Sequence, residues 1–383
     1  MSVPTNAAPE VLRRAHASAR DPEALERLAE ELGPGPFALV ILFLSPDAAL
    51  PGLAERVGAA FGDNPVVGCT TAGEISPDGY SEGGIVALGL PASHFAAETM
   101  LVPDLQSIDG HALIGDTIRT RQRLARACPD WENEFAFLMV DGLSVREDEL
   151  AATLASGLGP VPLFGGSAGD GTRFAATYVL HDGKLGQNIA SLSVIRTRCP
   201  IRVFSLDHLR PSEERMVVTE ADPARRLVRQ INAEPAAQEY ARLLGKDPGQ
   251  LTTFTFAAHP LVVRIGGRHH VRAIQRVAPN GDLVFFSAID EGMVLTLAEA
   301  QNMVNHLEGE LSRLAADREP AAILACDCVL RRIEAEEKQM FGQISDILRR
   351  HHVTGFSTYG EQLGSVHVNQ TMTGVAIYPP KDG

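Results

Sequence analysis

Residues 66–74 read VVGCTTAGE, and two further stretches of the chain repeat their pattern. Residues 162–170 read PLFGGSAGD, and residues 353–361 read VTGFSTYGE. In each copy a hydroxyl residue stands two positions before the last glycine, and an acidic residue follows that glycine directly. The hydroxyl residues are Thr71, Ser167 and Thr358, and the acids are Glu74, Asp170 and Glu361. We call the three stretches the glycine units.

The sequence around each glycine unit repeats as well. An apolar run typical of a strand comes first, at residues 38–44, 135–140 and 321–325. A helical segment, the glycine unit and a further apolar run follow, the last at residues 84–90, 189–195 and 373–378. The pattern predicts repeated β-α-β-β units. We therefore expect an α/β or α+β protein with two domains of layered sheets and covering helices.

A glycine at the end of an apolar strand permits a positive φ or the close approach of another group to the backbone. Ligands of open α/β sheets tend to bind beyond the strand ends. The glycine units, with their hydroxyl and acidic residues, are therefore the predicted ligand-binding surface. The alternative is that the glycines only shape bulged turns, and that the acids only satisfy backbone donors.

Composition limits the class of protein. A chain of 383 residues exceeds what one core usually supports, so two domains are expected. Its 34 basic and 48 acidic residues give a net charge of −14, which disfavours nucleic acids and anionic membranes as partners. Five cysteines, an odd number, favour a reducing compartment. The longest apolar run, residues 37–44, is too short to span a bilayer, and the polar start lacks a signal-peptide core, so we expect a soluble cytoplasmic protein without membrane insertion.

Turn and cap signals divide the chain further. Asp21-Pro22 and Gly33 bound a helix, so residues 1–34 are predicted to be an N-terminal helical segment. Residues 35–222 and 223–383 are the two predicted domains, joined by a helical stretch at 222–245. Asp182-Gly183 and Asn280-Gly281 predict hairpins. In the second domain we expect a strand at 252–257, a long helix at 297–316 and a crossover helix at 333–351.

Histidine offers the candidate metal ligands. Alternation in residues 365–378, SVHVNQTMTGVAIY, places His367, Asn369, Thr371 and Thr373 on one polar strand face beside the third glycine unit. His367 is therefore the first candidate ligand of a metal centre, and the alternative is a solvated hairpin histidine. His259, inside an apolar segment, is the second candidate, and its alternative is a core histidine.

Arginine and cysteine supply further candidates. Arg332, just after the strand that ends at Cys328, is placed to pair with a carboxylate or propionate, or else with surface acids. A hydrolase or transferase that uses Cys328 or Thr358 as nucleophile is an alternative class of protein, but the sequence places no convincing general base beside either residue. Cys326 and Cys328 are too few ligands for a structural zinc site and are expected to be buried thiols.

A series of motifs resembles one family. GCTTAGEI at 68–75 and FGGSAGD at 164–170 are followed, in the family's order, by HPLVVRIG at 259–266, FFSAIDEG at 285–292 and GFSTYGEQ at 355–362. From about residue 37 to 378 the chain is similar to the FIST family, in both its N-terminal and its C-terminal domain. The resemblance implies a bacterial input module for signal transduction rather than an enzyme, and a small ligand such as an amino acid.

Some members of that family are hemoproteins that sense nitric oxide and regulate a histidine kinase or a cyclic-di-GMP enzyme. The resemblance therefore implies heme as cofactor, with His367 as its axial ligand, and such an enzyme as partner in trans, since only PPKDG follows Tyr378. A second copy of the chain, forming a homodimer, is a further candidate partner. The alternative ligand is an amino acid or similar metabolite held at the glycine units, with Glu361 or Arg332 recognising its charged groups.

Overall fold

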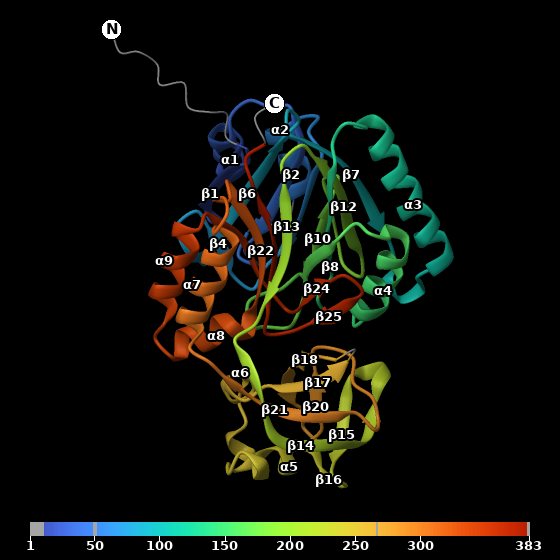
Figure 1. The fold of residues 1–383 in the computed structure, drawn as a ribbon, viewed down its shortest axis with the longest axis vertical. Helices are drawn as coiled ribbons and strands as arrows, with labels where there is room; N and C mark the ends of the chain where they lie inside the picture. The colour runs from blue at the N-terminus through green and yellow to red at the C-terminus, as the bar shows by residue number, and fades with distance from the viewer. Residues whose placement is uncertain (1–10, 49–51, 266, 381–383) are drawn as a thin grey trace.

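The computed structural model describes residues 11–48, 52–265 and 267–380. These residues form a body built from three sheets and a smaller lobe below it (Figure 1). The lobe, residues 209–300, is inserted between the strand β13 (Ile201–Leu206) and the helix α7 (Met303–Leu314), which both belong to the body. The body holds all three glycine units.

The three sheets of the body share one strand order. The first runs β1 (Arg13–Ser18), β6 (Gly84–Pro91), β2 (Phe37–Leu44), β3 (Val66–Thr70), β10 (Val179–His181), β11 (Lys184–Gly186). The second runs β7 (Phe95–Val102), β12 (Ala190–Thr197), β8 (Asn133–Val140), β9 (Leu163–Ser167), β24 (Glu361–Leu363), β25 (Val366–Val368). The third runs β13 (Ile201–Leu206), β26 (Met372–Ile377), β22 (Ala322–Cys328), β23 (Val353–Thr358), β4 (Glu74–Ser76), β5 (Gly79–Ser81).

Each repeat lends a hairpin to a neighbouring sheet. The β4–β5 hairpin of the first repeat extends the third sheet, β10–β11 of the second extends the first sheet, and β24–β25 of the third extends the second sheet. The exchange closes a ring of three. The hairpins β4–β5 and β24–β25 begin at the last residue of their glycine units, whereas β10–β11 follows the second unit after the 170–176 loop. The exchange brings the three glycine units to the centre of the body.

The strand β2 is apolar throughout, and both of its faces are covered. Leu39, Ile41 and Phe43 of β2 point into the core between the three sheets, whereas alternate residues of the same strand pack under helices. Phe43 stacks on Phe356 of the third repeat, with ring centroids 4.6 Å apart. Full burial of one such side chain contributes roughly 1.5–3 kcal/mol to folding.

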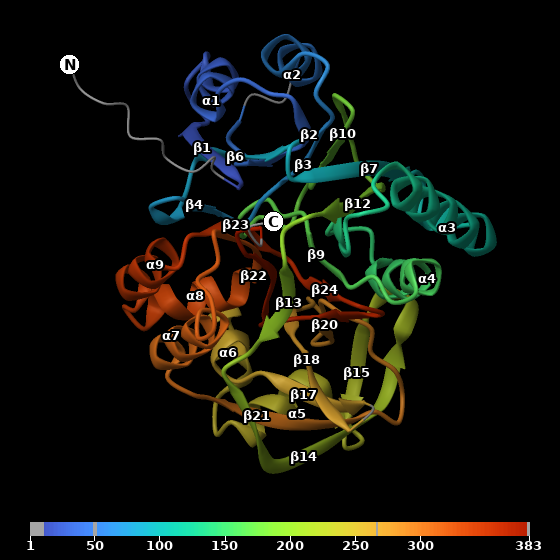
Figure 2. The same cartoon turned by 45° about the horizontal axis from the view of Figure 1, so that its top comes forward.

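Helices cover the outer face of each sheet, as Figure 2 shows around the common centre. The first sheet is covered by α1 (Ala24–Leu32) and α2 (Leu53–Phe61), and the second by α3 (Gly110–Ala127) and α4 (Glu147–Leu158). Against the third pack α7 (Met303–Leu314) and α9 (Phe341–Arg350), with α8 (Val329–Glu337) beside them. The predicted α/β class with layered sheets, covering helices and repeated units is confirmed.

The lobe is mainly antiparallel. Its strands are β14 (Leu209–Asp222), β15 (Leu227–Ile231), β16 (Glu234–Pro235), β17 (Leu261–Ile265), β18 (Arg268–Arg272), β19 (Ile274–Val277), β20 (Leu283–Phe285) and β21 (Val294–Ala300). Its helices are α5 (Ala236–Leu243) and α6 (Thr253–Ala258), and short 3-10 turns lie at Pro223–Arg225, Pro248–Gln250 and, in the body, Leu105–Ser107. The predicted boundary after residue 222 falls within this lobe, at the end of β14.

Several predicted elements differ from the structure. The hairpins at residues 182–183 and 280–281 are confirmed. The segment 1–34 contains β1 besides its helix, and in the stretch 222–245 the strands β15 and β16 come before α5, which covers only Ala236–Leu243. Residues 252–257 lie in α6 because Thr252 and Thr255 cap one another reciprocally, which outweighs their strand propensity.

Two predicted helices are also interrupted. Residues 297–316 begin in β21, and α7 starts only after Asn302, whose side chain accepts the N–H of Asn305 at 2.9 Å. The predicted crossover helix at 333–351 is two helices, because Gln339 adopts a φ of 55° and the chain turns before α9.

Candidate functional site

Backbone hydrogen bonds join the three glycine units in the body. The N–H of Ala72 donates to the carbonyl of Ser357 at 2.9 Å, and the N–H of Gly169 donates to the carbonyl of Thr70 at 2.9 Å. The N–H of Ser167 donates to the carbonyl of Gly360 at 2.8 Å. Each unit is therefore bonded to both others, although they are nearly 100 residues or more apart in sequence.

Glycine is required where the units pack closely. Gly73 has a φ of +122°, and a Cβ built on it would lie 2.4 Å from Nη1 of Arg332. At Gly360 a Cβ would lie 2.3 Å from Cε1 of His367. Any larger residue would have to displace a buried side chain at either position.

The acids of the first and third units are bound by the hydroxyl residues of the same unit. Thr71 donates to Glu74 at 2.5 Å, and Thr358 donates to Glu361. Burial raises the pKa of Glu74 to about 7 and that of Glu361 to about 8, although these hydrogen bonds oppose the shift. Both carboxyl groups consequently titrate near neutral pH.

The acid of the second unit organises the loop that follows it. The carboxylate of Asp170 accepts the backbone N–H groups of Phe174, Ala175 and Ala176 at 2.8–2.9 Å. It also accepts the hydroxyl of Tyr359 from the third unit. Glu74 and Glu361 also each accept one backbone N–H, from Gly84 and Thr371. All three acids thus satisfy backbone donors, and Asp170 additionally ties the 170–176 loop to the third unit.

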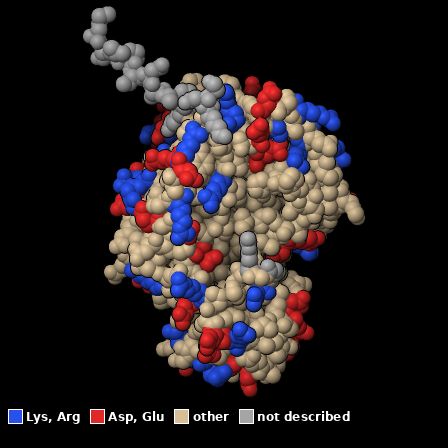
Figure 3. All heavy atoms as spheres, viewed as in Figure 1, with Lys and Arg blue, Asp and Glu red and all other residues tan. Residues whose placement is uncertain are grey.

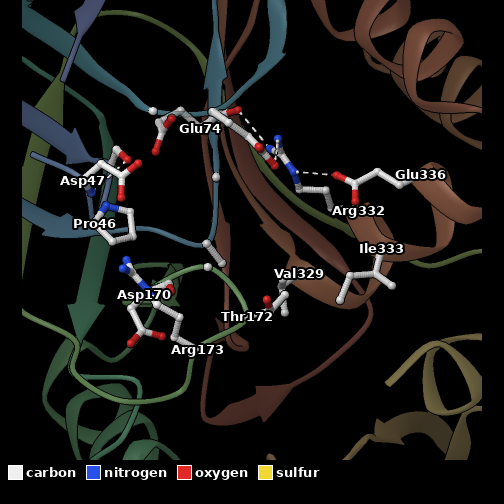
Figure 4. A pocket seen from close by; sticks show the side chains of 16 residues that line it. Pro46, Asp47, Glu74, Asp170, Thr172, Arg173, Val329, Arg332, Ile333 and Glu336 are labelled. Atoms are coloured by element: carbon white, nitrogen blue, oxygen red, sulfur yellow. Dashed lines mark hydrogen bonds and ion pairs between the residues drawn. The ribbon is translucent and has the colours of Figure 1, made fainter. Parts of the chain in front are cut away.

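A pocket of about 350 Å³ lies beside two of the glycine units. Its walls come from residues 45–47 after β2, residues 72–74, residues 82–83, residues 170–173 and the face of α8 with Val329, Arg332, Ile333 and Glu336. In Figure 4, Arg332 and Glu336 on α8 face Pro46 and Asp47 across the pocket. We call this the ligand pocket.

Arg332 forms one wall of the ligand pocket and is 2% exposed. Its guanidinium donates to Glu336 and Glu82 and to the carbonyl of Ser81, at 3.0–3.3 Å. It also stacks over the rings of Tyr80 and Phe341, 5.0 and 5.2 Å from their centroids. Arg332 is therefore fixed in position by partners on both sides of the pocket wall.

Carboxylates outnumber cations around the ligand pocket. The acids are Asp47, Glu74, Glu82, Asp170 and Glu336, and the cations are Arg173 and Arg332. Arg173 is exposed and uses its Nε to donate to the carbonyl of Asp170 at 3.0 Å. Such a site favours an ammonium group, and Arg173 can still offer its terminal nitrogens to a carboxylate.

The structure brings only part of the predicted set to the pocket. Glu74, Asp170 and Arg332 line it, whereas Thr71, Ser167, Thr358 and Glu361 are fully buried in the turns. Sequence reasoning missed Asp47, Arg173 and Glu336. The available signals were the position of Asp47 just after an apolar strand and the i, i+4 spacing of Glu336 from Arg332.

Arg331, next to Arg332, is fully buried in a separate polar network. Its Nε donates to Asp327 at 2.7 Å, and its Nη1 lies 2.9 Å from Nδ1 of His208, which follows β13 at the entrance to the lobe. Glu334 lies 2.9 Å from the other ring nitrogen of His208. The network joins α8 to the connection between body and lobe.

The surroundings of His367 do not fit an axial ligand of heme. The side chain is 1% exposed rather than solvated, and its Nδ1 lies 3.1 Å from the amide nitrogen of Gln362. Its Nε2 has no hydrogen-bond partner and lies 2.6 Å from the position of a Cβ on Gly360, so this edge of the ring faces backbone. His259, the second candidate, is half-buried at the end of α6.

Neither predicted nucleophile has the surroundings that nucleophilic catalysis needs. Cys328 is 1% exposed, and burial raises the pKa of its thiol well above the ordinary value. Thr358 is fully buried and bound to Glu361. Within the described ranges, no three histidine, cysteine, aspartate or glutamate side chains gather closely enough to hold a metal ion.

The chain is thus built on three repeats that exchange hairpins, with a pocket beside two of the glycine units. Comparison with family models gives the family: residues 38–234 match the FIST N domain and residues 236–363 match the FIST C domain. The chain belongs to the FIST family, whose domains are sensor domains of signal transduction and not a catalytic family. No match was found among curated proteins.

The family boundary at residues 234–236 lies inside the lobe, between β16 and α5. The two family domains therefore share both the lobe and the body. Among the helices of the described residues, none combines the length and apolar character needed to cross a membrane.

Proposed function

We propose that this chain is a sensor that binds a small metabolite carrying an ammonium group and a carboxylate, such as an amino acid, in the ligand pocket. The single observation that carries the proposal is the pocket itself, in which five carboxylates and two guanidiniums surround about 350 Å³ beside the glycine units. That volume accommodates a ligand of this size. We further propose that the sensor acts in the cytoplasm on a separate partner, such as a histidine kinase or a cyclic-di-GMP enzyme.

The charges of the ligand pocket suggest how the ligand is oriented. The carboxylate of Asp47 accepts no hydrogen bond from a described residue and lies opposite α8, so it is the first candidate to receive the ammonium group. Arg173 is the candidate for the carboxylate, because Arg332 is already held by Glu82 and Glu336. A cation that binds near Glu74 would also favour its ionised form and lower its pKa.

The test is thermal unfolding of the purified protein with a panel of amino acids, simple amines and simple carboxylates. A ligand of the folded state raises the unfolding temperature, by an amount that grows with the logarithm of its concentration above the dissociation constant. We expect an amino acid to stabilise the wild type, and expect Asp47→Asn and Arg173→Gln each to weaken that effect. Arg126→Gln, on the exposed side of α3, is the matched control.

Two results would count against the proposal. Stabilisation that persists unchanged in both pocket variants would place the ligand elsewhere. A stoichiometric Soret band after hemin addition, shifted by nitric oxide and lost in His367→Ala, would instead establish the heme sensor that the family resemblance implies, and would require His367 to leave its position against Gly360.

A further inference from the structure

A groove lined by arginine side chains runs from the junction of body and lobe onto one face of the lobe. Two adjoining pockets of about 360 and 370 Å³ form it, and Arg225, Arg276 and Val284 line both. One pocket lies between the loop at residues 142–145, before α4, and the lobe, and the other lies over β15, β19 and β20. Figure 1 shows β15 and β20 in the lobe below α4. We call this the arginine groove.

Strand register explains the part of the groove that lies over the lobe. Leu227 of β15 and Arg276 of β19 both pair with Val284 of β20, which lies between them. Directly paired residues point to the same face of a sheet, so the three form one row across it. Val228 and Leu283 point to the other face and are buried in the lobe's core. This outward row is part apolar and part cationic.

Two guanidiniums in the groove are uncompensated. Arg225 and Arg276 are exposed, and within the described part of the chain neither side chain has a hydrogen bond or an ion-pair partner. One acid, Asp282, also lines the groove, and its carboxylate accepts the side-chain amide of Asn280 at 2.9 Å. Arg226 differs, since it is buried and its Nη2 donates to Glu147 at 2.7 Å. Elsewhere acidic and basic side chains are interspersed, as on the face in Figure 3, and the whole chain carries a charge of −14. The groove is thus a local cationic surface on an acidic protein.

The other end of the groove is apolar. Phe174 and Phe286 line it with ring centroids 5.6 Å apart. Val145, at its rim, is 41% exposed and adopts a φ of 60°, which is unusual for a β-branched residue. An occupant of the whole groove would meet an apolar hollow and then two free guanidiniums.

We propose that the arginine groove binds an acidic segment of a partner protein. Its carboxylates would pair with Arg225 and Arg276, which can each offer two parallel donors. An aromatic or aliphatic side chain of the segment would pack against Phe174 and Phe286, as buried anchors do in interfaces. Two pockets in succession suit an extended segment better than one compact metabolite. The rest of the protein is acidic overall and would repel an acidic partner, so binding in the groove would also fix the orientation of that partner.

The position of the groove relates it to the ligand pocket, and this part of the inference rests on the proposed function. Asp170 lines the ligand pocket, and its carboxylate accepts the N–H of Phe174, which lines the groove. The 170–176 loop is therefore a shared wall. A ligand ammonium that competes for Asp170 would alter the position of Phe174 and so the apolar end of the groove.

The direct test is fluorescence anisotropy with the full chain and a labelled, capped hexapeptide of aspartates and glutamates around one central phenylalanine. We expect the double variant Arg225→Glu, Arg276→Glu to bind at least about tenfold more weakly at low ionic strength, a difference of about 1.4 kcal/mol. The matched control is Arg20→Glu, Arg126→Glu, which makes the same change in net charge at two exposed arginines whose side chains bond to no described residue. Both double variants should keep the wild-type unfolding temperature, because all four side chains are exposed.

Each outcome decides the proposal. Selective loss of binding in the groove variant, no binding of the matching lysine peptide, and weaker binding when alanine replaces the phenylalanine would support it. Equal binding to both double variants would overturn it, and so would no binding up to millimolar peptide. Displacement of the peptide by equimolar inorganic pyrophosphate would overturn it in favour of a small-anion site. Because the assay needs no metabolite, its result is independent of the proposed ligand.

Discussion

Replacement of Glu361 by glutamine should make the protein more stable above neutral pH. Burial raises the pKa of this carboxyl group from 4.5 to about 8. A carboxyl whose pKa is higher in the folded state binds its proton more tightly there, so its contribution to stability is lost as the pH rises from about 4.5 to about 8. One pKa unit corresponds to about 1.4 kcal/mol of folding free energy, so the full shift corresponds to about 5 kcal/mol. Roughly 3 kcal/mol of this stability is lost between pH 4.5 and pH 7.

Glutamine resembles the protonated form of Glu361. Its amide can still accept from the N–H of Thr371 and donate to a threonine hydroxyl, whereas it cannot ionise. We therefore expect Glu361→Gln to match the wild type near pH 5 and to be more stable by roughly 2–4 kcal/mol at pH 8. Urea unfolding at half-unit steps between pH 5 and 8.5 measures the difference, which should grow by about 1.4 kcal/mol per pH unit.

Two controls separate this effect from others. Glu361→Ala leaves Thr358 and Thr371 without their acceptor and should be less stable than the wild type at every pH. A Glu361→Gln variant that is less stable than the wild type by a constant amount at all pH values would refute the reasoning. It would mean that the carboxylate is ionised in the folded protein and held by its threonine donors.

Two substitutions and one labelling experiment test the packing. Gly73→Ala should destabilise the protein by about 1–3 kcal/mol or more, because of its positive φ and the contact with Arg332, and a urea midpoint equal to that of the wild type would contradict it. Arg226→Gln should cost about 3–5 kcal/mol by leaving Glu147 buried without its partner, with an unchanged midpoint as the opposing result. In a thiol-reagent titration of the native protein, Cys128 should react quickly and the other four cysteines slowly, since those four are buried; several fast thiols would contradict the structure.

Local sequence patterns predicted the elements whose structure depends on near neighbours. The apolar runs at 38–44 and 135–140 are central strands because every residue there gains from burial on one face or the other. The hairpins at residues 182–183 and 280–281 form because those pairs suit a tight turn. Threonine-rich residues 252–257 misled the propensity argument, since a cap decides where a short helix begins.

The candidate site was only partly predictable for a related reason. The glycine units pointed to Glu74 and Asp170, but not to Asp47 or Arg173, which belong to the pocket through contacts between separate elements. His367 shows the same limit. Alternation placed it on a polar strand face, and polar faces are usually solvated. The prediction of one strand is wrong, because β25 ends at Val368, Gln370 adopts a φ of 49° and β26 begins at Met372 in another sheet. The side chain of His367 is 1% exposed.

The sequence by itself determined that the chain has three related units, each with apolar strands, a glycine turn and a fixed acid. Those features follow from burial and backbone geometry over a few residues. Only the tertiary structure decided that each unit lends its hairpin to a neighbour. Strand edges pair through backbone N–H and C=O groups, which are the same for every residue type, so the sequence does not show which distant strand an edge will pair with. That exchange brings the three turns together and leaves the ligand pocket beside two of them.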